Sequence, residues 1–394
     1  MNFSFAVARL PRVEFGAGRL RVVPELAASF GPRVLIVTGE RSFTETPTWA
    51  ALRIDLLEFG LAWEIVHVSG EPSPSLVDAE VKQHAAGGFN CVLGIGGGSA
   101  LDAAKAIAGL LRPGNSVMDH LEGVGPELPY IGPATPFIAV PTTAGTGSEA
   151  TKNAVLSVHG RNGFKKSFRD DKLVAEYAVI DPDLLATCPP GVLAANGMDA
   201  FTQLLESYVS SKANPFTDAL AVSGMAVVRD ALLPWYEGHG DLAAHRAGMA
   251  YAAWLSGITL AQVGLGSVHG LASPLGAYFP IPHGVVCGTL VAEATRMNVA
   301  VMRERAPDHA ALGRYAEMGR LMTGRDLSDG EAQTALIDLL EDWTRRLDLP
   351  RLGAYGVAQV DVDCIVVNSR GSSMKTNPIA LTDAEIAEIV LARL

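Results

Sequence analysis

The stretch NCVLGIGGGSALDAAKAIAGLL, residues 90–111, decides the fold. Residues 91–95 are apolar, which predicts a buried strand, and the alanine-rich residues after Ser99 predict a helix. Three consecutive glycines, 96–98, join the two elements. Glycines let another group approach the backbone closely, and the N–H groups at a helix start attract an anion. The stretch therefore predicts a strand–loop–helix unit with an anion site, and pyrophosphate is the obvious anion.

A plain structural interpretation of this loop stays open beside the functional one. The spacing of Gly94, Gly96 and Ser99 does not match G-x-G-x-x-G, because the third glycine is missing. The loop is then a tight turn in which Ser99 caps the helix and Asp102 favours its positive end.

Further strands are predicted on both sides of this stretch, at residues 33–38, 63–68, 136–141 and 177–180. A helix-like apolar pattern separates the first two, so the first half of the chain is expected to form an alternating α/β sheet. After Pro189 and Pro190, long Ala- and Leu-rich segments predict helices. We expect an α/β domain over residues 1–185 and an all-α domain over residues 186–394.

Composition excludes several classes of protein. The chain has 394 residues, 48% hydrophobic and 19% charged, which is too apolar for a disordered protein. A net charge of −11 argues against a nucleic-acid partner. Residues 247–292 carry no Asp, Glu, Lys or Arg, but their Gly, Pro, Ser, Gln and His content predicts a buried helical core rather than a membrane span. Four cysteines without CxxC spacing fit a reducing compartment, and we expect a cytoplasmic protein.

A second loop of small residues, PTTAGTGSE at 141–149, follows the strand at 136–141. It offers the hydroxyls of Thr142, Thr143 and Thr146 and many backbone donors. Two such loops indicate a nucleotide between them. The alternative for either loop alone is a turn with local side-chain-to-backbone hydrogen bonds.

The helical half carries a candidate metal site. Asp199 and Gln203 are four residues apart, which puts their side chains on one helical face, and Glu206 follows three residues later. His269 and His283 lie in the charge-free stretch, where imidazoles need partners. Two histidines and a carboxylate suit Zn²⁺ or Fe²⁺ with a position open for substrate. The alternative is a pair of satisfied core histidines.

Taken together, these motifs resemble the iron-containing (group III) alcohol dehydrogenases, relatives of the glycerol dehydrogenases and dehydroquinate synthases. The resemblance runs essentially from end to end. It rests on PRVEFGAGRL (11–20), GIGGGSALDAAKA (94–106), PTTAGTGSEAT (141–151), IDP (180–182), GMDAFTQLLESYVS (197–210), GSVHGLASPLG (266–276) and IPHGV (281–285).

The resemblance implies an NAD(P)-dependent alcohol dehydrogenase or aldehyde reductase for a small alcohol or aldehyde. It implies an α/β domain for the dinucleotide, a helical domain for one divalent metal, Fe or Zn, and a homodimer or larger homo-oligomer. The implied cofactor contacts are Gly97, Gly98 and Ser99 at the pyrophosphate with Asp102 nearby, Thr142, Thr143 and Thr146 along the cofactor, and Asn153 and Lys165 on its ribose and nicotinamide side. The implied metal ligands are Asp199, Gln203, His269 and His283.

Three positions depart from the family's pattern. Gln203 stands where a histidine ligand is usual, so the fourth donor would be a weaker amide oxygen. Ser273 stands where many relatives carry a histidine proposed to assist proton transfer; a hydroxyl can only pass a proton along a water chain. Gly39 stands where NAD-preferring relatives often have an aspartate. With Arg41 and Ser42 following, NADP is expected to be accepted or preferred.

Two alternatives keep the same architecture. Maleylacetate reductases resemble this family and work without a metal, which the Gln203 substitution would suit. A lyase similar to dehydroquinate synthase would instead hold NAD tightly and recycle it, with no net turnover of NAD(P)H.

Overall fold

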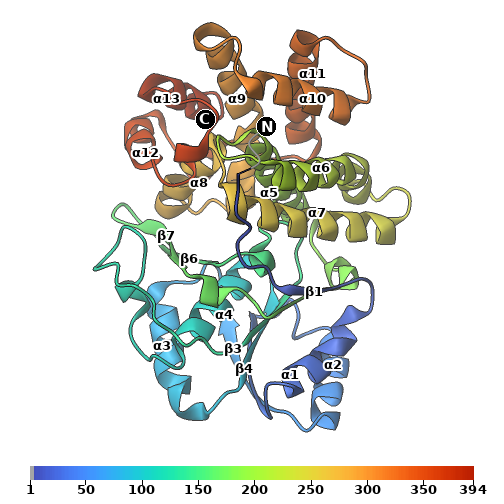
Figure 1. The fold of residues 1–394 in the computed structure, drawn as a ribbon, viewed down its shortest axis with the longest axis vertical. Coiled ribbons are helices and arrows are strands. Elements are labelled where there is room, and N and C mark those ends of the chain that lie inside the picture. The colour runs from blue at the N-terminus through green and yellow to red at the C-terminus, as the bar shows by residue number, and fades with distance from the viewer. Residues whose placement is uncertain (1–3) are drawn as a thin grey trace.

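The computed structural model describes residues 4–394 and has two halves, an α/β half and a helical half (Figure 1). A six-stranded parallel sheet forms the centre of the first half, in the order β1-β8-β5-β4-β2-β3. Its strands are β1 (Arg12–Phe15), β2 (Arg33–Gly39), β3 (Ala62–Val68), β4 (Cys91–Gly96), β5 (Phe137–Pro141) and β8 (Tyr177–Ile180).

Helices cover both faces of this sheet. They are α1 (Val23–Ala28), α2 (Pro47–Glu58), α3 (Pro74–His84) and α4 (Gly98–Leu110). Alternate residues of a strand point to opposite faces, so Val34 and Ile36 pack with α1 and α2, whereas Leu35 and Val37 pack with α3 and α4. A strand buried on both faces must be apolar throughout, which explains the continuous apolar run of β2, residues 34–37.

The predicted fold class is confirmed, and the five strands expected from the sequence are β2, β3, β4, β5 and β8. The sequence analysis missed the edge strand β1 and a separate antiparallel hairpin, β6 (Asn153–Val158) and β7 (Phe164–Arg169). The run FKKSFR of β7 is half-buried and positively charged, so it lacks the apolar signal of a core strand.

The second half is helical. Its helices are α5 (Pro190–Val209), α6 (Pro215–Tyr236), α7 (Leu242–Val263), α8 (Ser267–Tyr278), α9 (His283–Arg305), α10 (Ala310–Thr323), α11 (Asp329–Arg346), α12 (Val362–Asn368) and α13 (Asp383–Leu391). The charge-free stretch falls on α7, α8 and the start of α9, which form much of this half's core, as predicted. By length and composition α9 could cross a membrane, but 78% of its most apolar window is buried inside the protein, as in a core helix.

Helix α7 contacts the other half at two places. Before β1 the chain runs along the helical half, where the Ala8 N–H donates to Gln262 Oε1 of α7 at 2.7 Å. The loop after β5 also lies directly on α7, backbone against backbone. A Cβ atom on Gly257 would be 2.2 Å from the carbonyl oxygen of Gly147, and Gly147 itself has a φ of +60°. Both positions therefore require glycine.

We expect Gly257→Ala to lower the free energy of unfolding by about 1–3 kcal/mol, because the added methyl group forces α7 away from the loop. Gly313→Ala in α10 is the matched control, since its Cβ would meet nothing within 4 Å. Helix propensity predicts that this control stabilises the protein by about 0.5–1 kcal/mol. Urea titration followed by tryptophan fluorescence measures both. Equal stability of the two variants would contradict the contact.

Candidate active site

Three adjacent strands bring the predicted cofactor residues to one edge of the sheet. Gly39 ends β2, Gly96 ends β4, and Pro141 of β5 pairs with Gly96. Carboxyl ends of neighbouring parallel strands meet at the same edge, where open α/β sheets bind their ligands. The Thr142 N–H donates to the Gly96 carbonyl at 2.9 Å, which holds the two small-residue loops together.

The turn between β4 and α4 has the form of an anion site. Gly97 is the N-cap of α4 and Ser99 lies inside the first turn, so the interpretation of Ser99 as the cap is wrong. No side chain caps this end of the helix, which leaves its first N–H groups free to bind an anion. A Cβ on Gly98 would be 2.7 Å from Thr146, and one on Gly97 would be 3.4 Å from Thr143. The second loop thus lies directly against the first.

A buried lysine that the sequence analysis missed connects α4 to the second loop. Lys105 is fully buried, and its Nζ donates to the Ser148 carbonyl at 2.8 Å and to Thr151 Oγ1 at 2.9 Å. It also donates to the Asn153 carbonyl at 2.7 Å. Asp102 accepts from Ser148 Oγ at 2.6 Å. A lysine three residues after Asp102 in an otherwise apolar helix is the signal that could have revealed it.

The predicted residues Lys165 and Ser273 lie where the two halves meet. Lys165 of β7 forms an ion pair with Glu71, which also accepts from Ser157 Oγ at 2.5 Å. Burial raises the pKa of Glu71, but Lys165 lowers it more, so this carboxyl stays ionised. Ser273 of α8 donates its hydroxyl to the Lys165 carbonyl at 3.1 Å. Ser273 therefore links the helical half to the β6–β7 hairpin.

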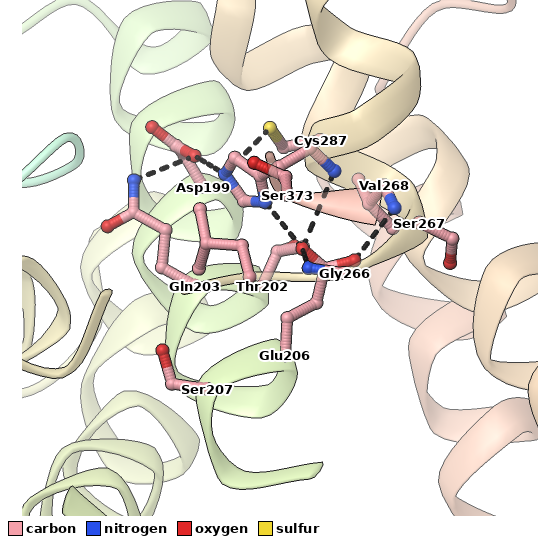
Figure 2. Close-up of polar contacts among 12 residues, drawn as sticks. Asp199, Thr202, Gln203, Glu206, Ser207, Gly266, Ser267, Val268, Cys287 and Ser373 are labelled. Atoms are coloured by element: carbon pink, nitrogen blue, oxygen red, sulfur yellow. Dashed lines mark hydrogen bonds and ion pairs between the residues drawn. The ribbon is translucent and has the colours of Figure 1, made fainter. Parts of the chain in front are cut away.

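The candidate metal donors come from three helices. Asp199 of α5 is completely buried, and its Oδ1 lies 3.2 Å from Nε2 of His269 on α8 and 3.8 Å from Nε2 of His283 on α9. Figure 2 shows Asp199, Gln203 and Glu206 projecting from the same helix. The structure therefore brings three of the four predicted ligands together through atoms that can bind a metal.

Glu206 orients one of these histidines. Its carboxylate accepts the backbone N–H groups of Gly266 at 2.9 Å and Val268 at 2.7 Å, and so satisfies the start of α8 (Figure 2). It also lies 2.7 Å from Nδ1 of His269. A histidine that donates through Nδ1 presents Nε2 to a metal, and a carboxylate is a common partner for such a ligand.

Gln203 joins the cluster through its amide nitrogen. Its Nε2 donates to Asp199 Oδ1 at 3.1 Å, and its Oε1 accepts from Ser256 Oγ at 2.7 Å. Ser256 is also 3.4 Å from the Gly145 carbonyl in the second loop. The amide oxygen expected to act as a donor thus faces Ser256, away from Asp199.

Cys287 completes the cluster, and the sequence analysis did not identify it. Its Sγ lies 3.6 Å from Nε2 of His269 and 3.8 Å from Nε2 of His283. The ligand atoms of Asp199, His269, His283 and Cys287 all lie within 4.8 Å of one another. Cys287 follows His283 by four residues on α9, the spacing that puts two side chains on one helical face. That spacing could have revealed it.

The electrostatics of Asp199 and His283 fit a divalent cation. Burial lowers the pKa of His269, but Cys287, Asp199 and Glu206 raise it well above its ordinary value, so an arriving ion would displace a proton from that ring. Burial, with Lys165, lowers the pKa of His283 to about 4 despite Asp199, so this imidazole is neutral at neutral pH. Burial raises the pKa of Asp199, but its contacts with His283, His269 and Cys287 lower it below its ordinary value, so the carboxyl is ionised. Within the described residues, Asp199 Oδ2 and His283 Nδ1 are buried without a hydrogen-bond partner. An ionised carboxylate beside a neutral imidazole is a donor set that Zn²⁺ and Fe²⁺ accept.

The sequence model described as iron-containing alcohol dehydrogenase matches residues 11–182, and the model of the C-terminal part of that family matches residues 193–394. The chain is 31% identical over 383 residues to the probable alcohol dehydrogenase EutG of Salmonella typhimurium, covering 96% of this chain and 91% of that protein. It is 28% identical to the NAD-dependent methanol dehydrogenase of Bacillus methanolicus, with 96% and 97% covered.

The fold matches solved structures of the same kind. Sulfoacetaldehyde reductase from Bifidobacterium kashiwanohense, in complex with NAD⁺, superposes with a TM-score of 0.84 at 25% identity, covering 100% of this chain and 99% of that one. The two family models match both halves of the chain, in order. The first match includes the loops at the strand ends, and the second includes the buried donor cluster. The chain therefore belongs to the iron-containing alcohol dehydrogenase family of oxidoreductases.

Proposed function

We propose that the protein is a metal-dependent, NAD(P)-linked alcohol dehydrogenase that also reduces the corresponding aldehyde. The observation that carries this proposal is the buried group of metal donors, Asp199, His269 and His283. Helix α8, which carries His269, contacts the β6–β7 hairpin of the α/β half through the hydrogen bond from Ser273 to Lys165. The relatives named above act on alcohols and an aldehyde, which supports a small alcohol or aldehyde as substrate.

The chain's own residues have distinct tasks in this reaction. The uncapped start of α4 would bind the pyrophosphate, and Thr142, Thr143 and Thr146 would line the cofactor. Asp199, His269 and His283 would hold the ion, with Glu206 fixing the ring of His269. When bound, the metal supplies a Lewis acid that polarises the aldehyde oxygen or lowers the pKa of the alcohol. Ser273 is the proposed group for passing the proton: its oxygen would accept one proton, and its own hydroxyl proton, which is donated to the Lys165 carbonyl, would be released to water.

We propose that the enzyme accepts NADP, because Gly39 at the end of β2 has no carboxylate to repel a 2′-phosphate. A Cβ there would meet only Ser42 Oγ, at 3.4 Å, so the end of β2 has room for an added group. The Arg41 side chain is 81% exposed, with only a 3.9 Å contact to Glu45, and is free to reach a 2′-phosphate. A cationic side chain held only by this long, exposed ion pair can turn to such a phosphate.

A cytoplasmic location and a homo-oligomeric state complete the proposal. All four cysteines are free, as suits a reducing compartment. The oligomeric state rests on the family resemblance alone, and sedimentation of the purified protein as a monomer would refute it.

We expect Asp199→Ala to reduce kcat/KM for aldehyde reduction about 100-fold or more, because it removes the charged donor and with it several kcal/mol of transition-state stabilisation. NADH binding, followed by fluorescence, is expected to survive, since Asp199 belongs to the helical half. Chelated wild-type protein should lose activity to a similar extent.

Two outcomes would contradict this prediction. Full activity of Asp199→Ala would refute the assignment of the site. Full activity of the chelated wild-type enzyme, with negligible metal, would favour the metal-free reductase instead.

We expect Gly39→Asp to raise the ratio of kcat/KM for NADH over NADPH at least about tenfold, equivalent to ~1.4 kcal/mol. The new carboxylate would accept from the ribose 2′-OH and repel a 2′-phosphate. Gly39→Ala is the matched control for the added bulk and should leave the ratio unchanged. An unaltered ratio in the aspartate variant would show that the end of β2 does not contact the ribose.

A further inference from the structure

We propose that Cys287, rather than Gln203, supplies the fourth protein donor to the metal, as a thiolate. The proposal rests on the metal dependence proposed above and specifies the site's ligand set. The site would then contain one carboxylate, two imidazoles and one sulfur.

The distances within the cluster carry this inference. Ligand-to-zinc distances of roughly 2.0–2.3 Å imply that the donors of one tetrahedral ion lie about 3.3–3.6 Å apart. Four ligand atoms form six pairs, and four of the pair distances compare directly with this range. Asp199 Oδ1 to the two histidine Nε2 atoms measures 3.2 and 3.8 Å, and Cys287 Sγ to the same two atoms measures 3.6 and 3.8 Å. The carboxylate oxygen and the sulfur thus both lie 3.2–3.8 Å from the same pair of imidazole nitrogens.

Gln203 is already engaged elsewhere. Its Oε1, the only atom of the amide that can bind a metal, accepts a 2.7 Å hydrogen bond from Ser256, while its Nε2 donates to Asp199. An amide turned in this way holds the carboxylate in place and does not compete for the ion. Gln203 is therefore a positioning residue.

The position of Cys287 on α9 suits a ligand. His283 and Cys287 are four residues apart, so one helix face presents both side chains to Asp199. Cys287 is fully buried, and within residues 4–394 its polar contacts are with the cluster's own residues. Binding replaces its S–H bond by a sulfur–metal bond and releases one proton to solvent. The thiolate would balance the second charge of the ion and favour a softer metal such as Zn²⁺.

Cobalt substitution tests this ligand set without relying on activity. Purified full-length protein is stripped by chelation and reloaded with Co²⁺ alone, and its absorption spectrum is recorded. A sulfur–cobalt bond gives an intense near-ultraviolet charge-transfer band, whereas nitrogen and oxygen donors give only the weaker visible bands. We expect the charge-transfer band in wild-type protein and in Gln203→Ala, and its loss in Cys287→Ser.

Matched controls separate a ligand from a structural residue. Cys364→Ser changes an exposed thiol outside the cluster and should keep the band. Removal of a partner outside the ligand set already changes metal affinity roughly 10–100-fold, so Cys287→Ser should weaken Zn²⁺ binding at least about tenfold. Should Cys287→Ser fail to fold, the wild-type spectrum alone decides whether sulfur is bound.

The contrary outcomes are distinct. Wild-type protein that binds Co²⁺ with visible bands but no sulfur band would overturn the role of Cys287 and leave the proposed function intact. Loss of Co²⁺ binding in Gln203→Ala, with binding kept in Cys287→Ser, would restore the glutamine as the ligand. Protein that binds no Co²⁺ yet reduces aldehydes at full rate would overturn both proposals.

Discussion

Two negative charges buried on one face of α5 govern the helical half. Asp199 and Glu206 are 0% and 7% exposed, and a buried carboxylate is tolerated only when donors or cations surround it. Glu206 finds its donors in the first N–H groups of α8, and Asp199 finds the imidazoles of α8 and α9. The packing of these three helices and the donor cluster therefore follow from one requirement. A site built on rigid helices in this way keeps its donor atoms in place.

The α/β half carries a candidate site for an anion instead of a cation. The loops of this site follow three neighbouring strands, β5, β4 and β2. The first turn of α4 has no side-chain cap. The buried ammonium of Lys105 ties α4 to the second loop through oxygens of Ser148, Thr151 and Asn153. Burial lowers the pKa of Lys105 to about 8, against the pull of Asp102 and Glu149. The charge that fixes the second loop thus belongs to α4, the helix whose first turn forms the candidate anion site.

Sequence reasoning reached the sheet, both loops and three residues of the buried cluster, because each leaves a local pattern. The run of β2 is apolar, glycines mark the turns, and the histidines stand out in a charge-free stretch. It missed the hairpin β6–β7, whose half-buried strands have no such pattern. The orientation of the Gln203 amide depends on Ser256, 53 residues away, and is visible only in three dimensions. Cys287 resembles any buried small residue until its neighbours are known.

The Ser256 hydroxyl lies where the two halves meet, and its single proton can be donated to Gln203 Oε1 at 2.7 Å or to the Gly145 carbonyl at 3.4 Å, in competition with the Ala253 carbonyl at 2.8 Å. Its hydroxyl lies between the Gly145 carbonyl of the second loop and the Gln203 amide, which in turn holds Asp199. If metal binding and dinucleotide binding are coupled through these residues, the coupling free energy is the same in both directions. A metal ion that tightens dinucleotide binding by a given factor must itself be bound more tightly, by the same factor, once the dinucleotide is present. Retention of the ion would then vary with the supply of cofactor.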